Sequence, residues 1–192
     1  MTGDVPSWCP DCGTSLDLRD VEGRPRPYCP SCESAVWVHP ATAADVAVVD
    51  GDRLLLVQRD VPPDEGAWAL PGGFLEYDED PAAGATRELE EETGIHADPA
   101  DLRLDDAVNY RREGGRRVLS LGYVVDRAAT SGAPPASSDA RAATFVSRAE
   151  VGTLDVSDGL PYMRDRISRL LTAADDPDDR TDGDSGSDVS RL

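Results

Sequence analysis

A cluster of glutamates has a spacing that places three of them on one side of a helix. Successive helical residues rotate by about 100°, so Glu88 and Glu92 lie about 40° apart, with Glu91 about 60° to the other side of Glu88. The three carboxylates therefore share an arc of about 100°. The adjoining arc carries the apolar side chains of Ala85 and Leu89, which can pack on a sheet.

These clustered carboxylates predict a site for a divalent cation, because they repel one another unless a cation joins them. Oxygen ligands without His or Cys select Mg²⁺ or Mn²⁺, and Mg²⁺ held by few carboxylates completes its coordination with water and substrate phosphates. The alternative is a solvated acidic helix. Two features favour the metal: the chain has 27 Asp and 11 Glu, yet the cluster contains only Glu, and Gly72 and Gly73 turn the chain just before it.

Two Cys-x-x-Cys pairs near the N-terminus predict a structural Zn²⁺ site. Sixteen residues separate the pair Cys9 and Cys12 from the pair Cys29 and Cys32. Each pair can direct both sulfurs to one ion, and four thiolates satisfy tetrahedral zinc. A redox pair and unbound thiols are the alternatives. The pattern resembles a zinc ribbon, and a closed four-sulfur site leaves no position for substrate, so its role is structural or in docking.

Turn and cap signals predict the elements that position these residues. Strands are expected over residues 45–49, 53–59, 68–74, 102–111, 116–126 and 141–147. Asp80 as N-cap and Pro81 at the first position begin a helix that Gly94 ends. Residues 148–173 carry an apolar stripe at helical spacing and predict a closing helix whose stripe packs in the core.

The order of these segments divides the 192 residues into three parts. Residues 1–40 hold all four cysteines. Residues 41–173, which alternate apolar stretches with Gly and Pro up to residue 147 and then look helical, are expected to form the main domain. Residues 174–192 consist mainly of Asp, Gly, Ser and Thr and have little to bury, so we expect a disordered acidic tail.

The charge balance of the chain is strongly acidic. There are 38 acidic and 19 basic residues, all of the latter Arg, and the net charge is -19. This composition resembles that of proteins from extreme halophiles and disfavours nucleic acid as a partner. No apolar run is long enough to span a membrane, and no basic region followed by an apolar stretch opens the chain, so we expect a cytoplasmic protein without a membrane partner.

The stretch from Gly73 to Ile95 reads Gly-x5-Glu-x7-Arg-Glu-Leu-x-Glu-Glu-x-Gly-Ile and resembles the Nudix box at every defining position. The flanking segments extend the resemblance over residues 46–171. It implies an α/β/α sandwich with a mixed sheet, preceded here by the zinc ribbon. It also implies a hydrolase that uses Mg²⁺ or Mn²⁺ to cleave the pyrophosphate of a nucleoside diphosphate linked to another moiety, and often a homodimer.

The resemblance assigns roles to residues of this stretch. The implied metal ligands are Glu88, Glu91, Glu92, the carbonyl of Gly72 and, from a loop beyond the box, Asp139. Glu88 would also orient or deprotonate the attacking water. Arg87 would hold the carboxylates by charge-assisted hydrogen bonds, and Glu79 would brace the loop against the helix.

The substrate is expected to resemble ADP-ribose or a dinucleotide. A zinc ribbon before a Nudix domain resembles the NADH pyrophosphatase architecture, but the Ser-Gln-Pro-Trp run of that group is missing after Ile95. Candidate substrate-binding residues are Arg111, in a basic cluster that could clamp phosphates, and Tyr110 and Trp68, which could stack on a base. Their structural alternatives are a solvated turn, a half-buried strand residue and a core residue.

Two other functions remain open. One is an NADH-type pyrophosphatase, which would differ only in pocket residues. The other is a non-catalytic regulator of the Nudix fold that docks on a protein or nucleic acid through its zinc ribbon. The intact cluster Glu88, Glu91 and Glu92 favours an enzyme, because a pure binding module has no need of clustered charge.

Overall fold

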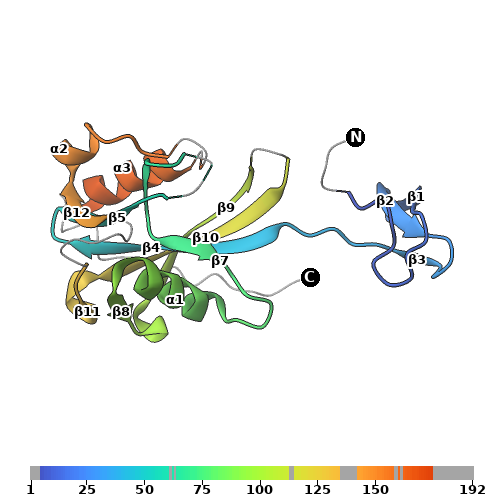
Figure 1. Cartoon of the computed structure of the whole chain (residues 1–192), viewed down its shortest axis with the longest axis horizontal. Coiled ribbons are helices and arrows are strands. Elements are labelled where there is room, and N and C mark those ends of the chain that lie inside the picture. Colours follow the sequence, from blue (N-terminus) through green and yellow to red (C-terminus); the bar gives the residue numbers. More distant parts are fainter. Residues whose placement is uncertain are drawn as a thin grey trace, which may run out of the picture.

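The N-terminal part of the chain forms a small antiparallel sheet of three strands. The computed structural model describes residues 5–60, 62, 64–112, 115–134, 142–157, 160 and 162–174. The strands are β1 (Asp17–Val21), β2 (Arg24–Cys29) and β3 (Ser34–Ala35), in that order across the sheet. Figure 1 shows this N-terminal unit apart from the rest of the molecule, to which residues 36–40 connect it.

The larger part is built on a mixed seven-stranded sheet whose main path is β12-β5-β4-β10-β9. Its strands are β4 (Ala41–Asp50), β5 (Arg53–Gln58), β6 (Trp68–Ala69), β7 (Gly72–Phe74), β9 (Arg103–Arg111), β10 (Arg117–Asp126) and β12 (Ala143–Ser147). Strands β4 and β10 are parallel and the other pairs are antiparallel. The predicted strands are confirmed, although β4 begins four residues earlier than expected, because its first residues pair with β10.

The expected extended segment over residues 68–74 forms two short strands, β6 and β7, which pair with β5 and β4 beyond the hairpin that joins these two strands. At the hairpin between β4 and β5, Val49 pairs with Leu54 and Asp50 pairs with Arg53. Farther along, β7 lies beside β4 and β6 lies beside β5. The chain therefore crosses from one strand to the other at residues 70–71 and places the glycine pair of β7 beside β4.

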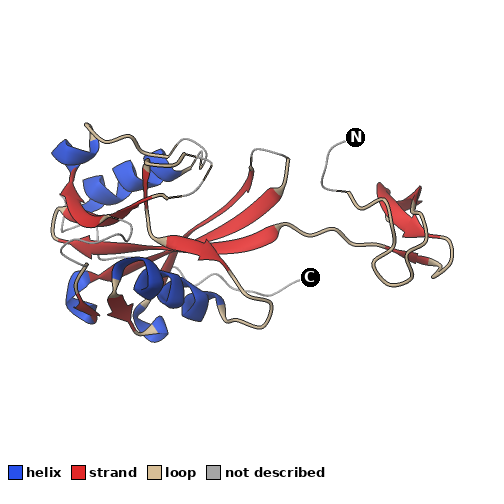
Figure 2. Ribbon diagram, viewed as in Figure 1, coloured by secondary structure: helices blue, strands red, loops and turns tan. Residues whose placement is uncertain are grey.

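Helices cover both faces of the sheet, as Figure 2 shows. The α-helices are α1 (Pro81–Thr93), α2 (Arg148–Val151) and α3 (Met163–Ala174), and short elements complete the fold: η1 (Pro99–Asp101), η2 (Arg127–Ala129), β8 (Ile95–Ala97) and β11 (Thr130–Gly132). The predicted α/β/α sandwich with a mixed sheet is confirmed.

Alternation along β4 separates the two cores. Successive strand residues point to opposite faces, so Val46 and Val48 pack in the core that contains Leu89 of α1, whereas Ala47 packs in the core that contains Ile167 of α3. All five side chains are fully buried. The apolar stripe of the closing helix is therefore core packing, as predicted.

The prediction of one helix over residues 148–173 is wrong in its middle. Helix α2 begins with a capping box between Ser147 and Glu150 and ends after four residues. The chain then runs beside β6, where the N–H of Trp68 donates to the carbonyl of Asp155 at 2.7 Å and the N–H of Ser157 donates to the carbonyl of Trp68 at 3.0 Å. Backbone groups that bond β6 cannot continue the helix, so α3 starts afresh at Met163.

Three expectations fall on residues outside the described part of the chain: the hairpin tip at 113–114, the candidate ligand Asp139, and the tail beyond residue 174. Within the described part, no helix has both the length and the apolar character needed to cross a bilayer.

Candidate active site

Helix α1 begins and ends at the predicted residues. The side chain of Asp80 accepts a hydrogen bond from the N–H of Ala82 at 3.0 Å, and Pro81 takes the first helical position. Gly94 adopts the left-handed conformation, with φ of 66°, and its N–H donates to the carbonyl of Glu90 at 2.8 Å. These caps fix the rotation of the helix, and hence which side chains face the sheet and which face outward.

The turn before α1 brings two backbone glycines against two of the glutamates. The N–H of Gly72 donates to the carboxylate of Glu92 at 2.9 Å. The carboxylate of Glu88 lies over Gly73, where an added Cβ would be 2.4–2.6 Å from the carboxyl atoms. A Cβ at Gly72 would lie 2.4 Å from the carbonyl oxygen of Ala44. Both glycines are therefore required for the carboxylates and the backbone to approach this closely.

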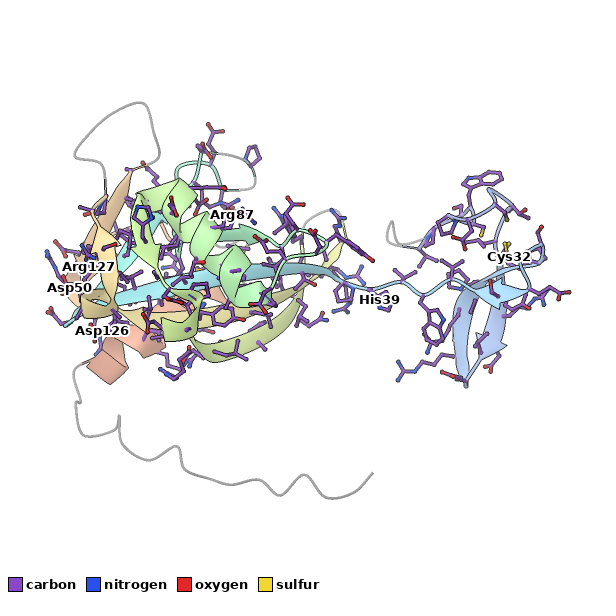
Figure 3. All side chains as sticks on the ribbon, turned by 90° about the horizontal axis from the view of Figure 1, so that it is seen from below. Cys32, His39, Asp50, Arg87, Asp126 and Arg127 are labelled. Carbon is purple, nitrogen blue, oxygen red and sulfur yellow. The ribbon has the colours of Figure 1, made fainter. Side chains whose placement is uncertain are left out.

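Arg87, labelled on α1 in Figure 3, links the loop before α1 to the glutamates through its hydrogen bonds. Its Nε and one terminal nitrogen donate to the two carboxylate oxygens of Glu79 at 2.8 and 3.0 Å. The other terminal nitrogen donates to Glu88 at 2.8 Å and to Glu91 at 3.4 Å. Hydrogen bonds from Arg87 lower the pKa of Glu79 to about 2, and the same bonds raise the pKa of Arg87, so this pair stays charged at neutral pH.

Glu88 and Glu92 border the glycine turn, and the three glutamates do not converge on a point. Among the described residues, the groups of potential ligands whose atoms lie within 4.8 Å of one another do not include Glu88, Glu91 and Glu92. Hydrogen-bond donors from Gly72 and Arg87 hold these carboxylates instead. The set still fits Mg²⁺ or Mn²⁺, because it offers hard oxygen donors around a glycine cradle and because Glu91, 59% exposed, can turn toward a cation.

A cavity of about 250 Å³ adjoins the glutamates. Glu88 and Glu92 line it together with Gly72 and Gly73, and the rest of its wall includes residues from β4, β5, β6, β9, β10 and α3. Tyr110 and Tyr162 form part of this wall, with ring centroids 5.2 Å apart and planes tilted by 49°. The carboxylates and an aromatic surface thus face one space.

The residues predicted to bind substrate lie in different places. Tyr110 is 8% exposed and lines the cavity. Arg111 is not among the described residues that line the cavity, whereas Arg112 lines it and places its guanidinium 5.6 Å from the ring centroid of Phe74. Trp68 is partly buried and packs against the core beside α3. The basic residues that line the cavity are therefore Arg112, the neighbour of the predicted residue, and Arg59.

A buried charged cluster that the sequence analysis missed lies in the cavity wall. Asp45 is 4% exposed, and its Oδ1 accepts a hydrogen bond from Arg166, which is 1% exposed. The Nε of Arg166 also lies 3.5 Å from Oδ2 of Asp105, as an ion pair without a hydrogen bond. Burial lowers the pKa of Arg166 to about 10, so the guanidinium remains protonated at neutral pH.

One sequence signal could have revealed this cluster. Gly122 interrupts the otherwise well-patterned strand β10, and a Cβ there would lie 2.4–2.7 Å from the guanidinium atoms of Arg166. A glycine inside a strand often marks a close approach by another group. It does not identify that group, so the partner could be found only in three dimensions.

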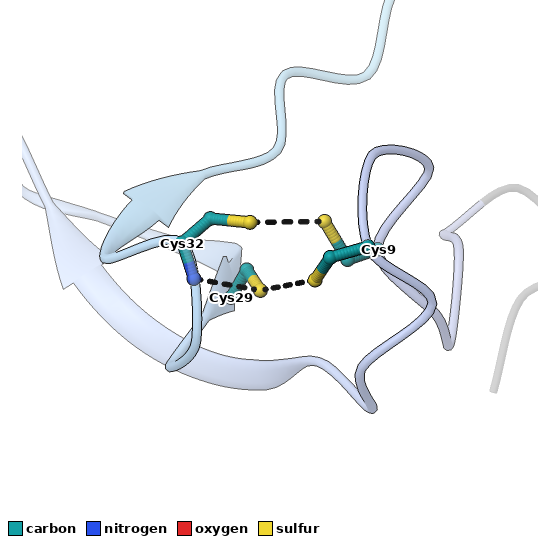
Figure 4. Close-up of side chains that lie close together, drawn as sticks. Cys9, Cys29 and Cys32 are labelled. Atoms are coloured by element: carbon teal, nitrogen blue, oxygen red, sulfur yellow. Dashed lines mark hydrogen bonds between the residues drawn. The ribbon is translucent and has the colours of Figure 1, made fainter.

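The four cysteines converge in the N-terminal unit (Figure 4). The Sγ atoms of Cys9 and Cys32 are 3.9 Å apart and those of Cys12 and Cys29 are 3.5 Å apart. All four lie within 4.8 Å of one another. A tetrahedron with zinc–sulfur bonds of about 2.3 Å has edges of about 3.8 Å, so the arrangement fits Zn²⁺, and the separations are far longer than a disulfide bond.

Comparisons with known proteins agree with this geometry. A family model described as the NUDIX domain matches residues 20–167. A MutT-like protein from Streptomyces ambofaciens is 31% identical over 148 residues, covering 71% of this chain and 90% of that protein. An ADP-ribose pyrophosphatase from Methanocaldococcus jannaschii is 33% identical over 110 residues, covering 57% of this chain and 63% of that protein.

A solved structure shares the fold over most of the chain. The crystal structure of a NUDIX hydrolase from Nitrosomonas europaea superimposes with a TM-score of 0.65. The match covers 87% of this chain and 91% of that one, at 22% sequence identity.

Proposed function

The chain belongs to the NUDIX family of hydrolases, and from that premise we propose that it is an Mg²⁺- or Mn²⁺-dependent enzyme. Its substrate would be a nucleoside diphosphate linked to another moiety, of which ADP-ribose is the model. Water would add across the pyrophosphate and release two phosphomonoesters. The observation that carries this proposal is the position of Glu88 and Glu92, held against Gly72 and Gly73 at the wall of a cavity.

Four groups at the glycine turn and on helix α1 would hold the cation. Glu88, Glu91 and Glu92 would bind it, with the carbonyl of Gly72 as a further donor. When bound, the metal supplies polarisation of the phosphates, charge neutralisation and a lowered pKa of water. Asp139, which lies outside the described residues, is proposed as an additional ligand.

The charged groups around the metal ligands would position the carboxylates and the attacking water. Arg87, anchored by two hydrogen bonds to Glu79, holds Glu88 and Glu91 in position. Glu88 lies at the cavity wall, where its carboxylate can orient the attacking water or accept its proton. This division makes Arg87 and Glu79 positioning residues and Glu88 the proposed base.

Two observations favour an ADP-ribose-like substrate. A relative named ADP-ribose pyrophosphatase is 33% identical over 110 residues. The cavity also combines an aromatic surface, Tyr110 with Tyr162, and a cation, Arg112, in one wall. A base can stack on the former while a phosphate pairs with the latter.

A substrate panel tests the proposal. ADP-ribose, NADH, diadenosine polyphosphates and deoxynucleoside triphosphates would be incubated with Mg²⁺ at low and high salt, because the net charge of -19 makes the protein repel itself when screening is weak. We expect the highest kcat/KM for ADP-ribose, with AMP and ribose 5-phosphate as products and no turnover when Mg²⁺ is omitted. Hydrolysis of none of these compounds would reject the enzyme and favour the binding module.

We also propose that Cys9, Cys12, Cys29 and Cys32 bind one structural Zn²⁺. The substitution Cys12→Ser should remove about one zinc per chain, because a hydroxyl does not replace a thiolate ligand. Elemental analysis of the purified protein would measure this. Ser31→Ala is the matched control, since Ser31 is exposed in the turn between Cys29 and Cys32 and should leave the zinc content unchanged. Equal zinc in wild type and Cys12→Ser would reject the site.

A further inference from the structure

Three oxygen atoms in the cavity wall lie within hydrogen-bond distance of one another. The hydroxyl of Ser120 donates to Oδ2 of Asp45 at 3.3 Å. The phenol oxygen of Tyr162 lies 3.2 Å from the same Oδ2 and 3.0 Å from Oγ of Ser120. All three residues line the cavity, and we call them the Asp45–Ser120–Tyr162 cluster.

Arg166 fixes the orientation of this cluster. It binds Oδ1 of Asp45 from the buried side, which leaves Oδ2 for the two hydroxyl groups. Gly122 provides the space for the guanidinium, as described above. The carboxylate therefore has a fixed direction without any ligand, and it presents one oxygen to the cavity side.

The number of protons in the cluster determines what it can offer a ligand. Asp45, paired with Arg166, contributes no proton, while Ser120 and Tyr162 contribute one each. Burial raises the pKa of Tyr162 to about 12, so its phenol keeps its proton at neutral pH. Both protons are used inside the cluster, whichever two of the three contacts they occupy. The oxygens keep unused lone pairs, so the cluster can accept a hydrogen bond at no loss, whereas donating one to a ligand would break a hydrogen bond inside the cluster.

The cluster lies next to the proposed metal site. Asp45 is paired directly with Gly72 in the sheet, and Gly72 donates its N–H to Glu92. Tyr110 packs on Tyr162 at the same wall and offers a ring to a base. A substrate whose phosphates lie at the glutamates can therefore extend its nucleoside along this wall.

We infer that the Asp45–Ser120–Tyr162 cluster is a specificity subsite that accepts a hydrogen bond from the nucleoside part of the substrate. This inference rests on the proposed function and adds to it the chemical class of nucleoside. The ligand group must be a donor, which is either the exocyclic amino group of a base or a ribose hydroxyl. A carbonyl oxygen at the same position could be bonded only if a hydroxyl gave up its hydrogen bond within the cluster, so it would be disfavoured.

Substrate analogues distinguish the two donors. Values of kcat/KM would be compared for ADP-ribose, for its hypoxanthine counterpart, in which a carbonyl replaces the amino group, and for analogues lacking the 2′- or 3′-hydroxyl of the adenosine. We expect at least one change to lower kcat/KM by about 10- to 100-fold. Loss with hypoxanthine assigns the amino group, and loss with a deoxy analogue assigns the hydroxyl.

Variants connect the preference to the cluster. Ser120→Ala and Tyr162→Phe should each reduce the ratio between ADP-ribose and the disfavoured analogue to within about threefold, because each removes one acceptor. Both substrates are measured on one preparation, so a loss of folded protein leaves the ratio unchanged. Tyr123→Phe is the matched control: Tyr123 is half-buried on the same strand as Ser120, packs in the core beside α1, and should keep the ratio.

The outcomes separate this inference from the proposed function. Equal hydrolysis of all four compounds by the wild type would overturn the subsite and leave the hydrolase intact. A preference that survives unchanged in both Ser120→Ala and Tyr162→Phe would also overturn it. Hydrolysis of none of the compounds would overturn the subsite and the hydrolase together.

Discussion

Glu92→Gln should lower kcat/KM for ADP-ribose by at least about 100-fold while the protein remains folded. The amide keeps the size of the side chain but loses the charge that a divalent cation requires. Glu92 accepts its hydrogen bond from Gly72 through a carboxylate oxygen, and a glutamine oxygen can accept the same bond, so the turn should be retained. Steady-state kinetics at saturating Mg²⁺, together with circular dichroism, would measure both effects.

Glu90→Gln provides the matched control for this loss. Glu90 lies on the same helix, but its side chain is 56% exposed and contacts His96 at 3.0 Å, away from the cavity. We expect this variant to retain kcat/KM within about twofold of wild type. Similar activity in Glu92→Gln and Glu90→Gln would mean that the clustered charge is a solvated surface.

Asp45→Ala should reduce the free energy of unfolding by about 3–5 kcal/mol, because it leaves Arg166 buried without its main counter-charge. Arg166 is 1% exposed, so water cannot replace the lost carboxylate without local opening. Urea unfolding at a fixed salt concentration would measure the change. Salt should alter it little, since buried pairs are weakly screened.

Two further variants test the origin of this destabilisation. Asp52→Ala removes an exposed carboxylate from the turn between β4 and β5 and should change stability by no more than about 0.5 kcal/mol. Combining Asp45→Ala with Arg166→Met removes both charges and should be less destabilising than the sum of the single changes. Full additivity, or a loss below about 1 kcal/mol in Asp45→Ala, would contradict the buried pair.

Helix α1 could be predicted in detail because its signals are local. The N-cap at Asp80, the proline after it and the left-handed glycine at Gly94 determine the ends of the helix within a few residues of chain. Once the ends are known, helical rotation determines which glutamates share a side. The hairpin between β4 and β5 followed from equally local turn residues.

The break between α2 and α3 could not be predicted, because its cause is distant in sequence. Residues after Val151 have a helical apolar pattern, yet Asp155 and Ser157 bond the backbone of Trp68. Periodicity reports which side chains are buried but not whether the backbone bonds itself or a strand. The interrupted helix lets this segment extend β6 beside the cavity.

The cavity wall was predicted incompletely for two reasons. Tyr110 of β9 and Arg112, directly after this strand, line the cavity, whereas Arg111 between them does not, so the basic cluster alone could not select the right arginine. Asp45 and Arg166 are 121 residues apart, and each resembles a surface residue in its own segment. Long-range pairing of this kind has no signal in a single sequence.

Anomalous diffraction from crystals soaked with Mn²⁺ tests the metal site most directly. We predict a manganese peak beside the glycine turn, with oxygens of Glu88, Glu91 and Glu92 at about 2.1–2.2 Å, and with Glu91 turned away from Arg87 toward the ion. A fully occupied peak elsewhere, with these three carboxylates still bound to Gly72 and Arg87 as in the metal-free arrangement, would contradict the account.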